Sequence, residues 1–323
     1  MTYIRLHAGC LAALFACAFA HAADYPTRPL RLIVPWVAGG GTDIVARILA
    51  PKMIDALGQQ VVIDNRPGAN GIIGAEVAAK AAPDGHNMVL HAVEHFINGS
   101  VQAKLNYDTL KDIAPVSLIA AHALVLIVQP AYPASSPKEL AAVAKAKPGQ
   151  LSFGSWGEGS LAHLSGELFK GSAALQMTHV PYKGAPQAAL DVIAGRVPFM
   201  FVTMPVGAPH VKAGKLKALA VTSAQRQALI PETPTMIESG YAGFQVDSWR
   251  GLYVPAGSPQ YAITRLNREL VKIMQMADVR ARINASGFDP LSSTPAELDA
   301  FGKAEFAKWA KVVKTAGVRS EKE

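Results

Sequence analysis

LRLIVPWVAGGGTDIVARILAPKMIDALG, residues 30–58, carries the alternation on which the fold depends. Residues 30–36 form a short apolar run rich in β-branched side chains, which predicts a buried strand. From residue 42 onward, apolar side chains recur every three or four positions until Gly58, which predicts a helix that ends at a glycine. A strand, a glycine-rich turn and a helix in this order form the first half of a βαβ unit.

The same alternation continues along the chain. Further strands are predicted at 60–64, 87–91, 123–129, 150–156, 177–182, 197–202 and 216–223. Further helices are predicted at 71–82, 136–147, 159–171 and 185–196, and an extended segment at 245–257 precedes three helical runs. Such a pattern predicts an α/β fold with parallel strands and right-handed crossovers, here arranged as two Rossmann-like units in tandem.

The first 22 residues have the pattern of a signal peptide, with a short apolar core and a small-residue cleavage site that ends at Ala22. A lipoprotein signal is the alternative, because LFAC at 14–17 resembles a lipobox, although Phe15 suits that box poorly. We therefore place cleavage after Ala22 and predict a periplasmic protein. Since Cys10 and Cys17 both precede that cut, cysteine chemistry is excluded from the mature chain.

The composition is that of a globular protein long enough for two domains, with 323 residues, 50% hydrophobic and 17% charged. The formal net charge is +7, but the basic residues are scattered rather than gathered into a stripe with interleaved aromatics. This distribution argues against nucleic acid as a partner. It favours a mild attraction for small anions.

The glycine loop PWVAGGGTD, residues 35–43, lies between the first predicted strand and its helix. Glycines let the backbone approach a ligand, and a helix N-terminus favours an anion. Thr42 or Asp43 is predicted to cap the helix. The loop completes neither a dinucleotide fingerprint nor a P-loop, so no cofactor is predicted. The candidate ligand-binding residues here are Trp36, Val37, Ala38, Gly40, Thr42 and Asp43.

A second loop of this kind, GSWGEGSLAH at 154–163, lies between a predicted strand and helix. It matches the loose G-x-G-x-x-A form, but the next strand ends without the acidic residue that a dinucleotide site needs. Glu158 is expected to point outward or to select an amine, and His163 to make a structural hydrogen bond. Two anion-friendly loops predict a carboxylate solute held between two domains. The candidate residues here are Ser155, Trp156, Gly157, Gly159 and Ser160.

The segment HAVEH, residues 91–95, reads as the H-x-x-E-H pattern of some zinc peptidases. It follows an apolar strand and precedes FINGS, which we predict to be a turn. In an extended chain His91 and His95 face one side and Glu94 the other. Zinc ligands at this spacing converge on one ion only in a helix, which is not expected here. We predict no metal site and place His91 and Glu94 on a cleft wall, with a secreted zinc hydrolase as the alternative.

Several longer motifs recur in one order along the chain, among them LRLIVPWVAGGGTDIVARIL, VVIDNRPGANGIIGAEVAAKAAPDG, PGQLSFGSWGEGSLAHLSGELF, HVPYKGAPQAALDVIAGRV and SWRGLYVPAGSP. With these motifs the chain resembles the Bug (TctC-like) family of periplasmic solute-binding proteins, which serve tripartite tricarboxylate transporters. The resemblance covers nearly all of the mature chain. It implies a type II periplasmic binding protein that closes on a small carboxylate or related compound by hinge motion, without catalysis. Membrane transporter subunits are the expected partners, with a free-standing sensor as the alternative.

The resemblance also implies where the lobes divide. Lobe 1 is expected at 24–122 plus 250–323, and lobe 2 at 123–249, with the hinge near 121–124 and 247–251. The family's ligand loops correspond to Val37–Asp43 and Ser155–Ser160. We expect a monomer.

Three departures from the family pattern lie near the expected pocket. This chain has DGHNMVLHAVEH where a small polar segment is usual, Val202 where an acid is frequent, and Trp156 where a small residue is common. We therefore include Val202 among the candidate residues. These changes predict a solute that is aromatic or carries nitrogen.

Overall fold

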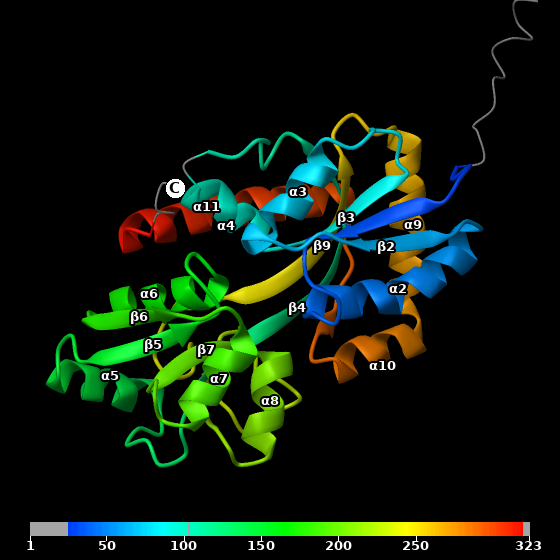
Figure 1. Ribbon diagram of the computed structural model, residues 1–323. Helices are drawn as coiled ribbons and strands as arrows, with labels where there is room; N and C mark the ends of the chain where they lie inside the picture. The colour runs from blue at the N-terminus through cyan, green and yellow to red at the C-terminus, as the bar shows by residue number, and fades with distance from the viewer. Residues whose placement is uncertain (1–24, 103, 319–323) are drawn as a thin grey trace, which may run out of the picture.

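The computed structural model describes residues 25–102 and 104–318. The predicted signal peptide and both cysteines lie outside the described residues. Figure 1 shows two α/β parts, drawn one above the other and connected by long strands. The predicted α/β class with two Rossmann-like units is confirmed.

The first βαβ pattern forms as the sequence predicts. Its members are β1 (Leu30–Val34), α2 (Gly41–Leu57), β2 (Val61–Asn65), the 3-10 turn η1 (Ala69–Gly71), α3 (Ile72–Ala79) and β3 (Asn87–Ala92). Strand β1 pairs in parallel with both β2 and β3. Leu32 and Val34 pack with Leu49 of α2, whereas Ile33 belongs to the hydrophobic cluster on the opposite face. Strand β1 is thus covered on both faces, as strands of parallel sheets are.

Two long antiparallel strands, β4 (Ile113–Val128) and β9 (Asp247–Pro255), run from one α/β part to the other. Strand β9 also pairs with β3, and the C-terminal part of β4 pairs with β7 (Phe199–Thr203) and β8 (Lys217–Val221). The prediction of a strand only at 123–129 was too short. Pro115 interrupts the apolar pattern, and the strand forms there because β9 supplies hydrogen-bond partners. The sheet is consequently mixed rather than purely parallel.

The second α/β part contains mostly elements that the sequence predicts. They are α5 (Pro137–Ala146), β5 (Leu151–Ser155), α6 (Leu161–Ala173), β6 (Met177–Pro181) and α7 (Ala185–Ile193). Ser136 caps α5 by accepting a hydrogen bond from the backbone N–H of Glu139 at 3.2 Å. Helix α8 (Met204–Lys212) was not predicted, because two prolines and a glycine weaken its local signal. Pro205 lies in its first turn, where the missing N–H is tolerated.

Three helices follow β9, as predicted. They are α9 (Gln260–Gln275), α10 (Ala277–Ala285) and α11 (Pro295–Ala316), with the short strand β10 (Asp289–Pro290) between the last two. Helix α11 begins at a capping box formed by Thr294 and Glu297. It contacts both α6 and the helix α4 (Glu94–Val101), so the end of the chain touches both α/β parts.

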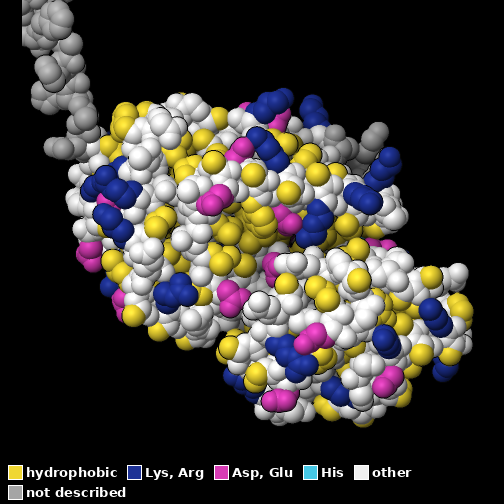
Figure 2. Space-filling view, turned by 180° about the vertical axis from the view of Figure 1, so that it is seen from behind, with side chains coloured by type: hydrophobic (Ala, Val, Ile, Leu, Met, Phe, Trp, Pro, Cys, Tyr) yellow, Lys and Arg dark blue, Asp and Glu magenta, His cyan; other side chains and the backbone are white. Residues whose placement is uncertain are grey.

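Within the described residues the strands join into one ten-stranded sheet, with β8 and β10 both pairing with β4 and the remaining order β2-β1-β3-β9-β4-β7-β5-β6. Seen from behind, the molecule has a hollow between its two parts, with hydrophobic side chains exposed at its floor (Figure 2). Lys and Arg side chains are scattered over this face of both parts, as the sequence suggests. None of the helices in residues 25–102 and 104–318 is both long and apolar enough to cross a membrane.

Candidate functional site

The glycine loop leads from the carboxyl end of β1 into α2. The N-cap is Gly40, which offers no side chain, so the prediction that Thr42 or Asp43 caps the helix is wrong. Asp43 instead lies in the first turn and accepts a hydrogen bond from the backbone N–H of Gly39 at 2.8 Å. Arg47 and Asn65 also donate to this carboxylate, at 2.7 and 3.0 Å. Asp43 therefore fixes the shape of the loop.

These contacts determine the charge of Asp43. Burial alone would raise the pKa of this carboxyl, but the hydrogen bonds from Arg47, Gly39 and Asn65 outweigh it and hold the pKa below its usual value. The side chain is fully buried. Along the rest of the loop, Val37 and Ala38 are exposed, and Trp36 and Gly40 are half-buried.

A buried arginine on β9 lies directly behind the start of α2. Nε of Arg250 donates to Thr42 Oγ1 at 3.3 Å, and Nη1 donates to the Ser248 carbonyl at 2.8 Å. A Cβ at Gly41 would lie 3.7 Å from Arg250 Nη2 and 3.0 Å from Phe288 Cζ. The glycine thus lets the backbone of α2 approach the guanidinium closely.

Arg250 keeps its charge although only 7% of its surface is exposed. Burial lowers the pKa of its guanidinium to about 10, against an opposing attraction from Glu94, so the group is cationic at neutral pH. Sequence analysis placed Arg250 only in the hinge and missed it as a site residue. The available signal was a single charged residue inside the otherwise apolar run SWRGLYV.

The HAVEH segment does not continue as an extended chain. Helix α4 begins at Glu94, so the prediction of a turn at FINGS is wrong: Phe96 and Ile97 face the core and stabilise the helix there. His91 and His95 do lie on one side, with their rings stacked 3.9 Å apart. His95 Nε2 lies 2.9 Å from the Thr109 carbonyl, to which it donates.

Glu94 is buried within electrostatic range of Arg250. The residue is 5% exposed, and its Oε2 has no hydrogen-bond partner within the described residues. Burial raises the pKa of Glu94, and the charge of Arg250 opposes that effect. His91 Nε2 and Trp36 Nε1 are also buried without partners in this part of the chain. Such orphan atoms are rare in folded proteins and are typical of ligand or water positions.

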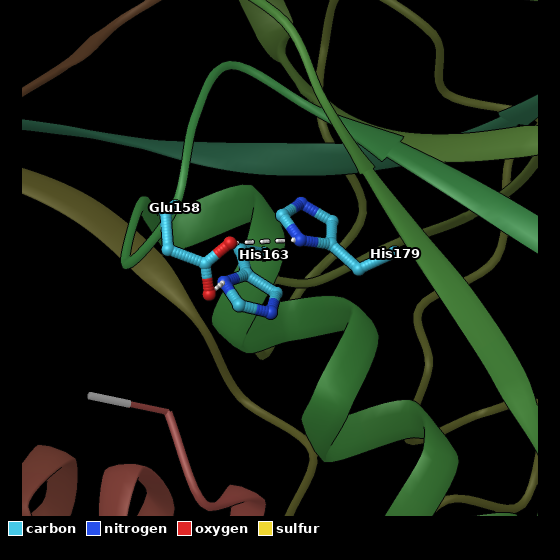
Figure 3. A group of neighbouring side chains, drawn as sticks. All are labelled: Glu158, His163 and His179. Carbon is cyan, nitrogen blue, oxygen red and sulfur yellow. Dashed lines mark ion pairs between the residues drawn. The ribbon is translucent and has the colours of Figure 1, made fainter. Parts of the chain in front are cut away.

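The second loop brings together residues that the sequence analysis treated separately. The rings of His163 and His179 stack with centroids 3.6 Å apart, and the Glu158 carboxylate lies beside both (Figure 3). Glu158, predicted to point outward or to select an amine, keeps 53% of its side chain exposed while its carboxylate lies against a ring nitrogen of each histidine. Ser155 Oγ contacts His179 Nε2 at 2.6 Å. The spacing of His179 in the sequence gave no signal for this cluster.

The remaining candidate residues of the second part lie in different surroundings. Ser160 is the N-cap of α6 and accepts a hydrogen bond from the backbone N–H of His163 at 3.3 Å. Trp156 is half-buried against two hydrophobic clusters. Gly157 and Gly159 adopt positive φ values of 133° and 66°, as glycines in tight loops do. Val202 belongs to β7 and is fully buried in an apolar cluster.

Acidification is expected to destabilise the fold through its buried histidines. Burial lowers the pKa of His95 to about 4 and that of His179 to about 4, whereas an unfolded histidine titrates near 6.5. Between pH 6.5 and 4 these histidines bind protons in the unfolded chain but not in the native one. The stability present above about pH 6.5 is therefore lost as the pH falls toward 4. Urea unfolding at pH 7.5 and 5 measures this loss. His95→Phe is expected to make the dependence shallower, and equal stability at both pH values would contradict it.

Residues 45–318 match the model of the family described as "Tripartite tricarboxylate transporter family receptor", TctC. The chain belongs to the TctC family. This TctC-family chain is 36% identical to Protein BugT of Bordetella pertussis over 297 residues, which are 91% of each chain. It is 35% identical to a UPF0065 protein from the tcbD-tcbE intergenic region of Pseudomonas sp. strain P51, over 90% of this chain and 86% of that one.

Solved structures of similar proteins have the same architecture. The periplasmic binding protein BugD matches with a TM-score of 0.79 and 33% identity, over 91% of this chain and 99% of that one. R. palustris Rpa4515 with adipate matches with a TM-score of 0.82 and 34% identity, over the same shares. MatC from Rhodopseudomonas palustris with bound malate matches with a TM-score of 0.78 and 30% identity, over 90% and 100%. The TctC-family chain is thus a solute-binding receptor with a periplasmic binding protein fold, and the zinc hydrolase alternative has no support.

Proposed function

We propose that this protein captures a small carboxylate-bearing solute in the periplasm, between two lobes, for uptake or sensing through a tripartite tricarboxylate-type system. Two similar proteins were solved with such solutes, adipate in Rpa4515 and malate in MatC. The membrane subunits of the transporter are its partners, and it acts as a monomer without catalysis.

The lobes proposed for this chain are residues 24–122 with 250–323, and residues 123–249. Strands β4 and β9 cross between them, where Ala123 pairs with Asp247. Two extended crossings of this kind permit rotation through small backbone changes at a few residues. A solute that contacts both lobes binds the closed arrangement more tightly and so shifts the population toward it.

The observation that carries the proposal is the buried guanidinium of Arg250 behind the N-terminal turn of α2. The first turn of a helix presents backbone N–H groups without intrahelical partners, and its dipole favours negative charge. A guanidinium adds a fork of donors that matches a carboxylate. A Cβ at Gly41, the first residue of α2, would lie 3.7 Å from Arg250 Nη2, so both kinds of donor are close together. A carboxylate of the solute is the group that satisfies them together.

Glu94 supplies the second part of the proposal, which is that the solute also carries a hydrogen-bond donor such as an amine or amide nitrogen. Its Oε2 is a buried acceptor with no partner within the described residues. Glu94 and Arg250 influence each other electrostatically, so the carboxylate and the donor belong on the same small molecule. Trp36 and Trp156, both half-buried and next to the two loops, are suited to contact an apolar part of it.

Isothermal titration with a matched solute panel tests both parts. The panel pairs each plain dicarboxylate with an analogue of the same length that carries an amine, an amide or an aromatic ring. Tighter binding of the nitrogen-bearing or aromatic members is expected. Binding restricted to plain dicarboxylates contradicts the role of Glu94, and binding restricted to uncharged solutes contradicts the role of Arg250. Glu94→Gln separates the two parts of the proposal. It is expected to reduce the difference in affinity between nitrogen-bearing solutes and plain dicarboxylates, and to leave carboxylate binding in place.

A further inference from the structure

The cluster beside the second loop combines three potential metal ligands from three different elements. Glu158 comes from the loop, His163 from the first turn of α6 and His179 from β6. Glu158 Oε1 lies 3.3 Å from His163 Nδ1, and Oε2 lies 3.2 Å from His179 Nδ1. Figure 3 shows both ring nitrogens directed toward the same carboxylate. The ligand atoms of the three residues all lie within 4.8 Å of one another.

These separations are close to those of a tetrahedral zinc site. Two ligands that each bind one Zn²⁺ at about 2.0–2.2 Å lie roughly 3.3–3.6 Å from each other. The side chains of His163 and His179 are only 5% and 11% exposed, and burial favours the neutral imidazole. Neutral imidazole is the form that binds a metal. The side chain of Glu158 is 53% exposed, which gives an ion a path from solvent.

The outer nitrogens of both rings already have polar neighbours suited to a metal-bound state. Glu167 Oε1 lies 3.9 Å from His163 Nε2, and Ser155 Oγ lies 2.6 Å from His179 Nε2. Ser155 Oγ can accept a hydrogen bond from the Nε2–H of His179 because its own hydroxyl donates to the Gly157 carbonyl at 2.9 Å. Each Nδ1 is then left with its lone pair for an ion. Outer partners of this kind orient histidine ligands in metal sites.

A cation would also relieve an unfavourable contact within the cluster of Glu158, His163 and His179. His163 Nδ1 accepts a hydrogen bond from the backbone N–H of Gly159 at 3.1 Å, so it carries a lone pair and no proton. The same atom lies 3.3 Å from the carboxylate of Glu158. A lone pair and a carboxylate oxygen repel each other at this distance, and a cation bound to both removes the repulsion.

Binding requires a defined local movement. The two rings are nearly parallel, at 5°, so their lone pairs do not both point at one position. One ring must turn about its Cβ–Cγ bond, and the N–H of Gly159 must withdraw from His163. His179 lies on the edge strand β6 with 11% of its side chain exposed, and Gly159 adopts a φ of 66° in the loop. His179 is thus partly accessible, whereas the N–H of Gly159 is buried and must move together with the loop.

From this geometry we infer that Glu158, His163 and His179 form a binding site for one divalent transition-metal ion, with Zn²⁺ as the best match to two imidazoles and a carboxylate. The inference departs from the sequence analysis, which predicted no metal. It does not depend on solute binding, and it leaves at least one coordination position for water or another oxygen ligand.

Metal titration of the mature chain without a histidine tag tests the inference. After treatment with a chelator, the wild type is expected to bind one Zn²⁺ per chain in calorimetry and to gain thermal stability with it. Co²⁺ in place of Zn²⁺ is expected to give the visible absorption of a tetrahedral site. Glu158→Gln, His163→Ala and His179→Ala should each weaken binding at least tenfold. Ser155→Ala should weaken it less than removal of a ligand does, since it changes an outer partner.

His210→Ala is the matched control, because this histidine lies on α8 of the same α/β part and outside the cluster. Circular dichroism establishes that each variant is folded. The inference is overturned if wild type binds Zn²⁺ no better than millimolar, or if folded His179→Ala and Glu158→Gln keep wild-type affinity. Loss of binding in His210→Ala equal to that in His179→Ala would also overturn it. Solute titration without zinc reports separately on the proposed function.

Discussion

Arg250→Gln is expected to weaken binding of the preferred carboxylate solute by about 30-fold to several thousandfold. Truncation of one partner in a buried charge pair costs about 2–5 kcal/mol, and about 1.4 kcal/mol corresponds to tenfold in affinity. Arg250 is 7% exposed and lies behind the first turn of α2. Water therefore has little access to the hydrogen-bond positions that the guanidinium would leave, and their loss costs free energy. Calorimetric titration with the solute that the wild type binds best measures the loss.

Two further variants make this result specific. Arg250→Lys keeps the charge but loses the planar fork, so its affinity is expected to lie between those of wild type and Arg250→Gln. Lys52→Gln removes a basic residue from α2 that pairs with Asp278 rather than with the glycine loop, and it is expected to leave affinity within about twofold. Melting temperatures separate loss of binding from loss of folding. A folded Arg250→Gln protein with wild-type affinity would rule out Arg250 as the carboxylate anchor.

Glu305→Leu is expected to destabilise the protein by roughly 2–6 kcal/mol, since each orphaned buried donor costs about 1–3 kcal/mol. Glu305 Oε2 accepts hydrogen bonds from Trp249 Nε1 at 3.1 Å and from Trp309 Nε1 at 3.0 Å. Both tryptophans are almost fully buried. Leucine fills a similar volume but accepts neither N–H. Urea unfolding, followed by circular dichroism, measures the change in the free energy of unfolding.

The control variants for Glu305 separate hydrogen bonding from charge. Glu305→Gln keeps a carbonyl acceptor and is expected to lose less stability than Glu305→Leu. Lys308→Ala removes the ammonium that donates to Glu305 Oε1 at 3.0 Å and is expected to cost about 1 kcal/mol or less. A Glu305→Leu protein within about 1 kcal/mol of wild type would show that the two indoles do not need this acceptor.

The link through Glu305 also bears on movement between the lobes. Trp249 belongs to the crossing strand β9, and Trp309 belongs to α11, which contacts both α4 and α6. A change at Glu305 thus acts on the proposed hinge as well as on stability. The solute affinity of Glu305→Gln, measured beside its stability, tells whether this link influences binding.

Local pattern explains the elements that were predicted correctly. The β1–α2–β2 unit, the Ser136 cap and the three C-terminal helices depend on side chains a few positions apart, and such neighbours interact within one strand or helix. Local pattern failed where the partner is distant. The first half of β4 exists because β9 pairs with it, and α4 because its apolar side chains meet the core. Helix α8 was missed because its prolines weaken the signal.

The sequence by itself determined the fold class, the two glycine loops and the family resemblance, since all three are properties of order and spacing along the chain. Only the tertiary structure brought Arg250 behind α2, through the antiparallel pairing of β9 with β3 and β4. Likewise, parallel pairing of β5 with β6 brings His179 opposite Phe153, within reach of His163 and Glu158. Contacts between residues so far apart depend on strand order and register, which no local spacing encodes.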